Sequence, residues 1–284
     1  MLAYPVSDKP IDYSKPVFIQ PKLDGVRCVI QRESDFPGQE YLASFSVKAY
    51  SRTGKEWKNI DHILKQLKPF FFKYPNAILD GELYNHDLKN DFEKIISLVR
   101  KTKPTAEDRL ESAEMVQFHC YDIIDEKLPF DQRIEFVTES LMLLGDSIYT
   151  VDTESVLTEL GSKMFHENNL KDGYEGSIVR TNDTYQCKRS HNLRKFKDFH
   201  DAEANITGWV EGKGKRKGTI GKFTAIDIDE NEFGMPVMGK FKDLQDNFEE
   251  MKTWVGEVAT FTYFERTKAG SYRHPLFKCI RNYE

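Results

Sequence analysis

The sequence has few cysteines and no long apolar run. Its four cysteines, Cys28, Cys120, Cys187 and Cys279, lie far apart among 284 residues, so they predict neither a zinc knuckle nor a disulfide framework, and we expect reduced thiols. No stretch of 18 uncharged apolar residues occurs, and residues 1–16 contain no basic segment followed by an apolar one. We therefore expect a soluble intracellular protein without a membrane partner.

The sequence also lacks a strong excess of charge of one sign. Charged residues make up 31% of the chain, but the net charge is only -5, so total charge does not indicate a polyanionic partner. The cations are nevertheless clustered. Residues 187–197 (CKRSHNLRKFK) contain five of them and no acid, and residues 212–218 (GKGKRKG) form a second cluster. Local clusters of this kind can bind nucleic acid phosphates.

The order of sequence patterns predicts two domains of mixed α+β structure. Alternating apolar segments predict strands, and apolar residues at helical spacing predict helices at 60–72, 91–101 and 153–165. After residue 199 the pattern changes to a hairpin around the basic glycine-rich loop, further short strands and one helix at 242–254. We predict a first domain at 1–199 and a small β-barrel of the OB type at 200–284.

Five segments carry residues suited to chemistry: a lysine, carboxylates, an aromatic ring and two further cations. They are Lys22, the pair Asp80 and Glu82, the pair Tyr121 and Asp122, Glu175, and the pair Lys195 and Lys197. Residues two apart on a strand share a face, so Asp80 and Glu82 should point the same way, as should Lys195 and Lys197. Taken singly, each segment has an ordinary structural explanation, such as an edge lysine with its ammonium in water.

The order and spacing of these segments resemble the covalent nucleotidyltransferase superfamily, which comprises DNA ligases, RNA ligases and mRNA capping enzymes. Its first motif, Lys-x-Asp-Gly-x-Arg, is complete at residues 22–27, and further motifs resemble 51–57 (SRTGKEW), 80–82, 121–122, 175–176 and 195–197. The segment 272–281 (YRHPLFKCIR) resembles the end of ATP-dependent DNA ligases, particularly the small two-domain bacteriophage enzymes. The resemblance covers nearly the whole chain. It implies an ATP-grasp-like nucleotidyltransferase (adenylation) domain followed by an OB-fold domain.

The resemblance also implies a mechanism. Lys22 would attack the α-phosphorus of ATP, release pyrophosphate and carry AMP as a phosphoramidate. The AMP would then pass to the 5′-phosphate of a nick and be displaced by the 3′-hydroxyl. A free lysine has a pKa of about 10.4, so the site must disfavour the ammonium, and burial beside Lys195 and Lys197 would do so.

The resemblance assigns further residues to ATP and a metal ion. Glu82 and Arg27 would hold the ribose, Tyr121 would stack on adenine, and the oxygen of Gln20 could accept a bond from the adenine amino group. Lys195, Lys197 and Mg²⁺, or Mn²⁺, would stabilise the α-phosphate, with Glu175 as the leading metal ligand and Glu82 as a second. Arg273 would meet the pyrophosphate, although the Arg-x-Asp-Lys sequence that family members use for this task is not found.

The expected partner is nicked double-stranded DNA. Arg52 would take the 5′-phosphate of the nick, and other cations would contact DNA phosphates without regard to sequence. These other cations are Lys188, Arg189, Lys213, Lys215, Arg216 and Lys217.

Several functions remain open. We expect an ATP-dependent DNA ligase, acting as a monomer in the cytoplasm of a bacterial or phage-infected cell. The nearest alternative is an RNA ligase with the same chemistry, and a capping guanylyltransferase is more remote. A different class of hypothesis is a non-catalytic OB-type nucleic-acid-binding protein. We do not expect NAD as the cofactor, because the nicotinamide-binding domain and the four-cysteine zinc module of NAD-dependent ligases are not recognisable.

Overall fold

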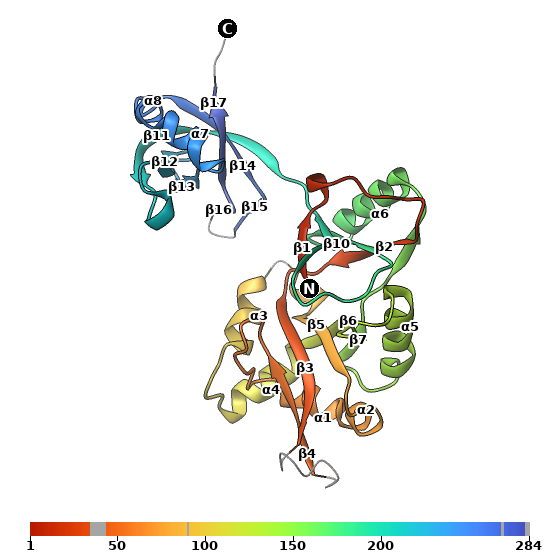
Figure 1. The fold of residues 1–284 in the computed structure, drawn as a ribbon. Coiled ribbons are helices and arrows are strands. Elements are labelled where there is room, and N and C mark those ends of the chain that lie inside the picture. Colours follow the sequence, from red (N-terminus) through yellow and green to blue (C-terminus); the bar gives the residue numbers. More distant parts are fainter. Residues whose placement is uncertain (35–43, 90, 268–269, 282–284) are drawn as a thin grey trace. The chain divides into compact units, whose positions relative to one another are not determined.

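A computed structural model describes residues 1–34, 44–89, 91–267 and 270–281 (Figure 1). The chain divides into two compact units, Met1–Phe196 and Lys197–Glu284, so the division lies three residues before the predicted boundary. Each unit combines helices with mainly antiparallel sheet, in agreement with the α+β prediction. No helix in these described ranges is long and apolar enough to cross a membrane.

The first unit contains two five-stranded sheets. One of them, called the larger sheet here because its strands contain more residues, lies at the centre of the main core. Its strands run in the order β4 (Phe45–Tyr50), β3 (Val26–Ser34), β5 (Ile78–Tyr84), β6 (Gln117–Ile123) and β7 (Ile148–Thr150). Neighbours are antiparallel except β6 and β7. Successive side chains of β3 point to opposite faces of the sheet. Cys28 and Ile30 are fully buried in the core, while Arg27 is on the opposite face.

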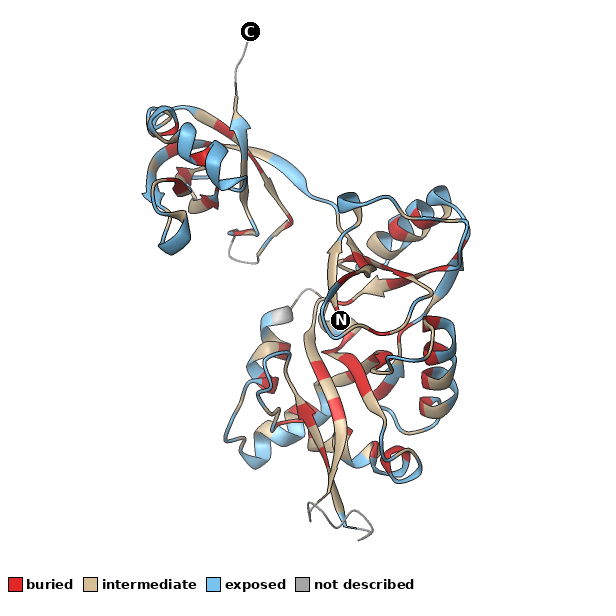
Figure 2. Ribbon diagram, in the orientation of Figure 1, coloured by how far each residue is buried: buried red, intermediate tan, exposed pale blue. Residues whose placement is uncertain are grey.

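Helices cover this sheet, and Figure 2 shows buried residues along its strands and on the inner sides of the helices. α1 packs on β4, α3 on β5, and α5 on β6 and β7. The helices of this part are α1 (Asp61–Gln66), α2 (Lys68–Lys73), α3 (Phe92–Val99), α4 (Ala106–Met115) and α5 (Phe130–Leu141). α4 and α5 are absent from the prediction.

The second sheet of the first unit has the order β1 (Leu2–Pro5), β10 (Arg189–Phe196), β9 (Gly176–Thr181), β2 (Val17–Lys22) and β8 (Glu154–Val156). Helix α6 (Glu159–Lys171) packs against β2 and β9. The prediction of a helix over 153–165 is wrong in its first half, because Val156 is buried in a strand paired with Val17. Thr158 then caps α6 by accepting a bond from the N–H of Gly161. Of the other apolar residues on the predicted helix face, Leu157, Leu160 and Met164 are exposed, whereas Phe165 is half-buried and packs against a small buried cluster that includes Val156.

The second unit is built on one antiparallel sheet. Its strands run in the order β13 (Glu232–Pro236), β12 (Ile220–Ile226), β11 (His200–Glu211), β14 (Val258–Tyr263) and β17 (Leu276–Ile280). β11 and β12 form the predicted hairpin, joined by the basic loop with a 3-10 turn at Gly214–Arg216. The predicted helix at 242–254 is two short ones, α7 (Phe241–Asp246) and α8 (Phe248–Lys252), and a small ribbon joins β15 (Glu265–Arg266) to β16 (Tyr272–Arg273).

The edge strands of this sheet, β13 and β17, come into contact, so the sheet is curled. Within the described residues no ladder of hydrogen bonds joins these two edges, and the sheet is not a closed barrel.

Candidate active site

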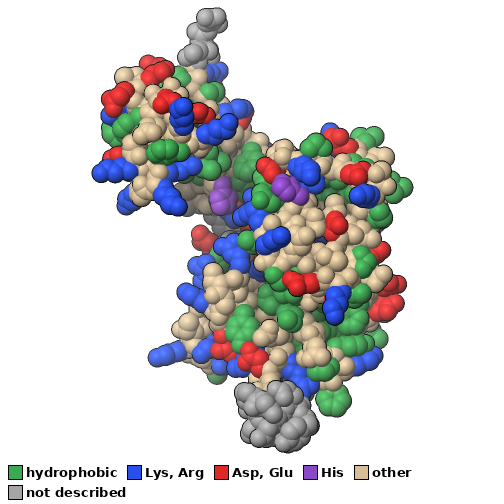
Figure 3. All heavy atoms as spheres, in the orientation of Figure 1, with side chains coloured by type: hydrophobic (Ala, Val, Ile, Leu, Met, Phe, Trp, Pro, Cys, Tyr) green, Lys and Arg blue, Asp and Glu red, His purple; other side chains and the backbone are tan. Residues whose placement is uncertain are grey.

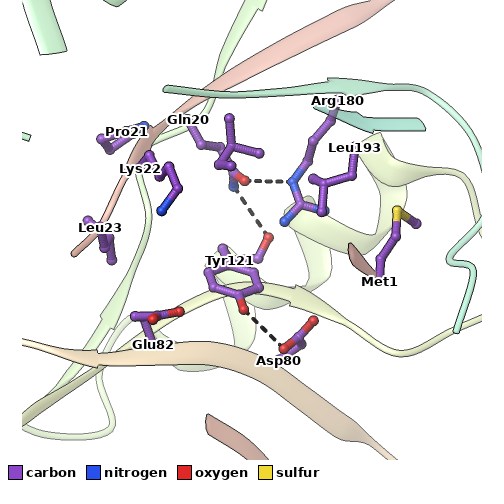
Figure 4. Close-up of a pocket in the computed structure, with 11 residues that line it drawn as sticks. Met1, Gln20, Pro21, Lys22, Leu23, Asp80, Glu82, Tyr121, Arg180 and Leu193 are labelled. Carbon is purple, nitrogen blue, oxygen red and sulfur yellow. Dashed lines mark hydrogen bonds between the residues drawn. The ribbon is translucent and has the colours of Figure 1, made fainter. Parts of the chain in front are cut away.

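A pocket of about 110 Å³ lies in the first unit and is lined from both of its sheets (Figure 4). The smaller sheet supplies Gln20, Lys22, Ile178, Arg180 and Leu193, and the larger supplies Asp80, Glu82 and Tyr121. Four residues predicted to bind ATP therefore line one cavity although they are spread over 102 positions of the sequence, from Gln20 to Tyr121.

Lys22 is the last residue of β2, opposite Gly176 of β9. Its ammonium forms an ion pair with the carboxylate of Glu175, whose side chain is only 5% exposed. The N–H of Glu175 also donates to the carbonyl of Lys22 at 3.1 Å. The direct neighbour of the lysine is thus a carboxylate, and such a neighbour acts against burial and the charges of Lys195 and Lys197, which were expected to disfavour the ammonium.

Gly176 permits this close pairing of Lys22 with Glu175. Its φ is +146°, in the range that favours glycine, and a Cβ at this position would lie 2.3 Å from the carbonyl oxygen of Phe196. Only glycine can therefore follow Glu175 without moving the neighbouring strand β10.

Asp80 and Glu82 both face the pocket, as the strand periodicity predicts. Burial raises the pKa of the Glu82 carboxyl to about 8; the charge of Lys22 opposes this shift, and that of Asp80 adds to it. Glu82 therefore holds a proton at neutral pH in the ligand-free protein.

Asp80 is 2% exposed and is the anchor of a buried polar network. Its two oxygens accept bonds from Nε and Nη2 of Arg27, both at 2.9 Å. They also accept bonds from the hydroxyls of Tyr185 at 2.7 Å and Tyr121 at 3.2 Å. The sequence pattern included Asp80 but predicted no role for it, and no motif marks Tyr185.

A second buried network lies beside Tyr121. Asp122 is fully buried and accepts bonds from Arg133 at 2.7 and 3.1 Å and from Arg180 at 2.7 Å. Arg180 also donates to Gln20 at 2.7 Å, and its guanidinium lies 5.4 Å from the centroid of the Tyr121 ring. Neither arginine belongs to the predicted site.

Lys195 lies near Lys22, whereas Lys197 does not belong to the same unit. Lys195 is on β10 opposite Ile178, and burial, together with the charge of Lys22, lowers the pKa of its ammonium. β10 ends at Phe196, so the prediction that Lys195 and Lys197 share a strand face is wrong. Lys197 begins the second unit, and its ammonium lies 4.5 Å from the centroid of the Phe264 ring.

The carboxylates suit a hard divalent cation. No group of three or more His, Cys, Asp or Glu side chains is close enough to hold a metal among the residues that the structure describes. Mg²⁺ does not need such a cage, because it keeps several waters and binds through one or two carboxylates and the phosphates of its substrate. Glu175, in contact with Lys22, would be one such carboxylate, and Glu82, on the pocket wall, would be a second once it has lost its proton.

The predicted DNA-binding residues of the first unit lie on its surface. Arg52 is exposed on a tight turn closed by a bond from the N–H of Gly54 to the carbonyl of Ser51 at 2.9 Å. Lys188 is exposed. Arg189 is also exposed, and its guanidinium donates a hydrogen bond to the carbonyl of Ala3 at 2.6 Å.

In the second unit, Lys213, Lys215 and Lys217 are exposed on the loop between β11 and β12. Arg216 of the same loop instead donates to the carbonyl of Val237 at 3.2 Å. Arg273 forms an ion pair with Glu265. Figure 3 shows lysine and arginine side chains on the visible surfaces of both units.

Comparison with known proteins places this chain in a family. The family model described as the ATP-dependent DNA ligase domain matches residues 1–197. A DNA ligase of African swine fever virus is 30% identical over 220 residues, which are 74% of this chain and 48% of the relative. The chain thus spans about half the length of that relative. A DNA ligase of Haemophilus influenzae is 24% identical over 282 residues, 98% of this chain and 90% of the relative.

Solved structures show the same fold. A structure described in a structure–function analysis of Lig E DNA ligases superposes with a TM-score of 0.76 at 22% identity, covering 99% of this chain and 98% of its own. The ATP-dependent DNA ligase of bacteriophage T7, solved in complex with ATP, superposes with a TM-score of 0.56 at 19% identity, covering 99% and 97%.

Proposed function

The chain belongs to the ATP-dependent DNA ligase domain family, and we propose that it joins the 5′-phosphate and 3′-hydroxyl ends of nicked duplex DNA with ATP as its cofactor. The observation that carries this proposal is the contact of Lys22 with Glu175 beside a pocket lined by Tyr121 and Glu82. It joins a nucleophile, an acid and a cavity with an aromatic wall in one unit.

Lys22 is the proposed nucleophile. Its ammonium must lose a proton before the amine attacks, and in the ligand-free protein the ammonium donates a hydrogen bond to the carboxylate of Glu175. If Glu175 were to hold a cation, its carboxylate would stabilise the ammonium of Lys22 less, and the charge of Lys195 would then favour the neutral amine. The bond from Nζ to the α-phosphorus forms as the bond to pyrophosphate breaks, which leaves AMP on Lys22 as a phosphoramidate.

The nucleoside is proposed to lie between Tyr121 and the apolar side chains of Ile178 and Leu193. Tyr121 is fixed by its hydroxyl bond to Asp80, so its ring is a preorganised stacking surface. Two donors of Arg27 are already used by Asp80, so Glu82 is the main proposed ribose ligand.

Glu175 and Glu82 are the proposed holders of Mg²⁺, which would supply positive charge beside the α-phosphate. Lys195 is proposed to act on the same phosphate. Lys197 and Arg273 are proposed to act there and on pyrophosphate, although both belong to the second unit.

The second unit is proposed to be an OB-fold domain, because its five-stranded sheet curls until its edge strands meet. The exposed lysines of the β11–β12 loop, with Arg52, Lys188 and Arg189, are proposed to contact DNA phosphates. We further propose that the chain acts as a monomer in the cytoplasm, with the adenylation domain at 1–199 and the OB domain at 200–284.

Sealing of a nick by the purified chain tests this function. With ATP and Mg²⁺, a duplex that carries one nick should become continuous, and the protein should gain the mass of one AMP. Lys22→Ala should abolish both, whereas Lys171→Ala, a change at an exposed lysine of α6, should leave both intact. AMP attached to the Lys22→Ala variant would contradict the assignment of the nucleophile. Sealing of nicked RNA but not nicked DNA would favour the RNA ligase alternative.

A further inference from the structure

The side-chain amide of Gln20 is held in one orientation by three neighbours. Gln20 is 2% exposed, and its Oε1 accepts a bond from Nε of Arg180 at 2.7 Å. Its Nε2 donates to Oγ1 of Thr153 at 2.8 Å and to the carbonyl of Tyr121 at 3.3 Å. Arginine can only donate and a peptide carbonyl can only accept, so rotating the amide by half a turn would create two repulsive contacts.

The neighbours of Gln20 also leave only one kind of hydrogen bond for a ligand. The hydroxyl of Thr153 donates its proton to the carbonyl of Val151 at 3.0 Å, so its oxygen is left to accept from Gln20. Both N–H groups of the amide are therefore used within the protein. An amide oxygen has two lone pairs, and Arg180 takes one of them. Toward the pocket, Gln20 can therefore act only as an acceptor.

Arg180 is itself fixed from the other sheet of the unit. It lies on β9, and its Nη1 donates at 2.7 Å to Asp122, a fully buried carboxylate on β6 that also binds Arg133. The guanidinium lies 4.8 Å from the centroid of the Phe130 ring. The planar guanidinium of Arg180 has little freedom to rotate, because its N–H donors are bound to both Gln20 and Asp122.

Gln20 and Arg180 lie on the pocket wall, among side chains suited to a planar ring (Figure 4). We propose that Arg180 is a positioning residue that makes the pocket select purines with an amino group at position 6, as in adenine, over purines with a keto group there. It does so by holding Gln20 as a hydrogen-bond acceptor. This inference rests on the proposed function, because it takes the pocket to be the nucleotide site.

The selectivity follows from hydrogen-bond pairing. An amino group at position 6 can donate to Oε1 of Gln20, whereas a keto oxygen would place two acceptors in contact without a proton between them. A buried acceptor left unpaired in this way lowers use of the wrong nucleotide by about 10- to 100-fold. ATP and ITP are the suitable probes, because hypoxanthine carries the keto group in place of the amino group of adenine.

The test compares the rates of covalent nucleotide attachment to Lys22 with ATP and with ITP. The wild-type protein should prefer ATP, and Arg180→Lys should lower the ATP:ITP ratio about tenfold, because one ammonium cannot replace the fork that reaches both Gln20 and Asp122. Gln20→Met should lower the ratio as much, while Gln20→Glu, which keeps an acceptor, should preserve it. Arg100→Lys, at an exposed arginine, is the matched control. General damage to the fold would slow both nucleotides and leave the ratio unchanged.

Three results would overturn the inference: equal use of the two nucleotides by the wild-type protein, a preference for ITP, or a wild-type ratio in Arg180→Lys. If no nucleotide becomes attached to the wild-type protein, the proposed function fails separately. The ratio of the dissociation constants of ATP and ITP, measured on the same variants, then decides the inference on Arg180.

Discussion

The pocket of the first unit and the basic loop of the second unit hold their cations in opposite ways. In and around the pocket, three cations are each paired with a specific carboxylate: Lys22 with Glu175, Arg27 with Asp80, and Arg180 with Asp122. On the β11–β12 loop, Lys213, Lys215 and Lys217 are exposed at the surface.

This difference separates two uses of positive charge. A buried ion pair fixes geometry, at the cost of removing both charges from water, and it fails when either partner is lost. Exposed lysines do not fix the geometry of the protein. When they bind DNA phosphates, however, they release counterions from the DNA, whatever its sequence. Substitutions in the pocket should therefore change chemistry and stability, whereas substitutions in the loop should change only DNA affinity.

The largest expected effect is that of Glu175→Gln on the attachment of AMP to Lys22. The amide keeps the shape but loses the charge that pairs with Lys22 and suits a metal ion. We expect the rate to fall about 10²- to 10³-fold, as for loss of one key electrostatic group in an active site. Single-turnover labelling with ATP measures it. Glu167→Gln, at an exposed glutamate of α6, is the control, and an equal loss in both variants would contradict the role of Glu175.

The next effect is that of Asp80→Asn on stability. The substitution leaves the guanidinium of Arg27 without its charge partner, and it weakens the bonds from Tyr121 and Tyr185. We expect the free energy of unfolding of the first unit to fall by about 3 kcal/mol. Urea denaturation monitored by circular dichroism measures this change. Asp146→Asn, at an exposed aspartate, should change it by less than about 0.5 kcal/mol, and similar losses in the two variants would argue against the anchor role of Asp80.

These pocket residues differ in how far the sequence predicts them. Lys22, Glu82 and Tyr121 follow from short motifs on strands, where a period of two sets which side chains share a face, and all three line the pocket. Asp122 belongs to a motif but is buried in an ion-pair network instead of facing a ligand. Arg180 could not be found, because an arginine in a strand has the pattern of a surface residue until its buried partners are known.

The fold shows the same limit of local patterns. The strands around Lys22 and Glu82 could be predicted because their alternation and their flanking turn residues are local signals. The segment 153–165 could not, because the pairing of β8 with β2 depends on residues far away in the sequence: Val156 pairs with Val17, which lies 139 positions earlier. Lys197 was misplaced for a related reason, since β10 ends at the division between the units.

A smaller effect is expected from the loop. Lys213→Gln combined with Lys215→Gln should weaken binding of nicked duplex DNA about tenfold at 0.1 M salt, and it should reduce the slope of log affinity against log salt by about 2. Attachment of AMP to Lys22 should not change. Titrations at several salt concentrations measure both values. Lys240→Gln combined with Lys242→Gln removes the same charge from exposed sites of the same unit, and an identical slope in the two double variants would show that the loop has no special role.

The last effect concerns the proton of Glu82. Burial raises the pKa of this carboxyl from 4.5 to about 8. Between these pH values the folded protein holds a proton that the unfolded chain releases, so the free energy of unfolding should fall as pH rises toward 8, by up to about 1.4 kcal/mol for each pH unit. Glu82→Gln cannot ionise, so it should lose this part of the pH dependence and gain stability relative to the wild type as pH rises. Urea unfolding of both proteins from pH 5 to pH 8 measures the difference, and parallel curves would show that Glu82 ionises alike in both states.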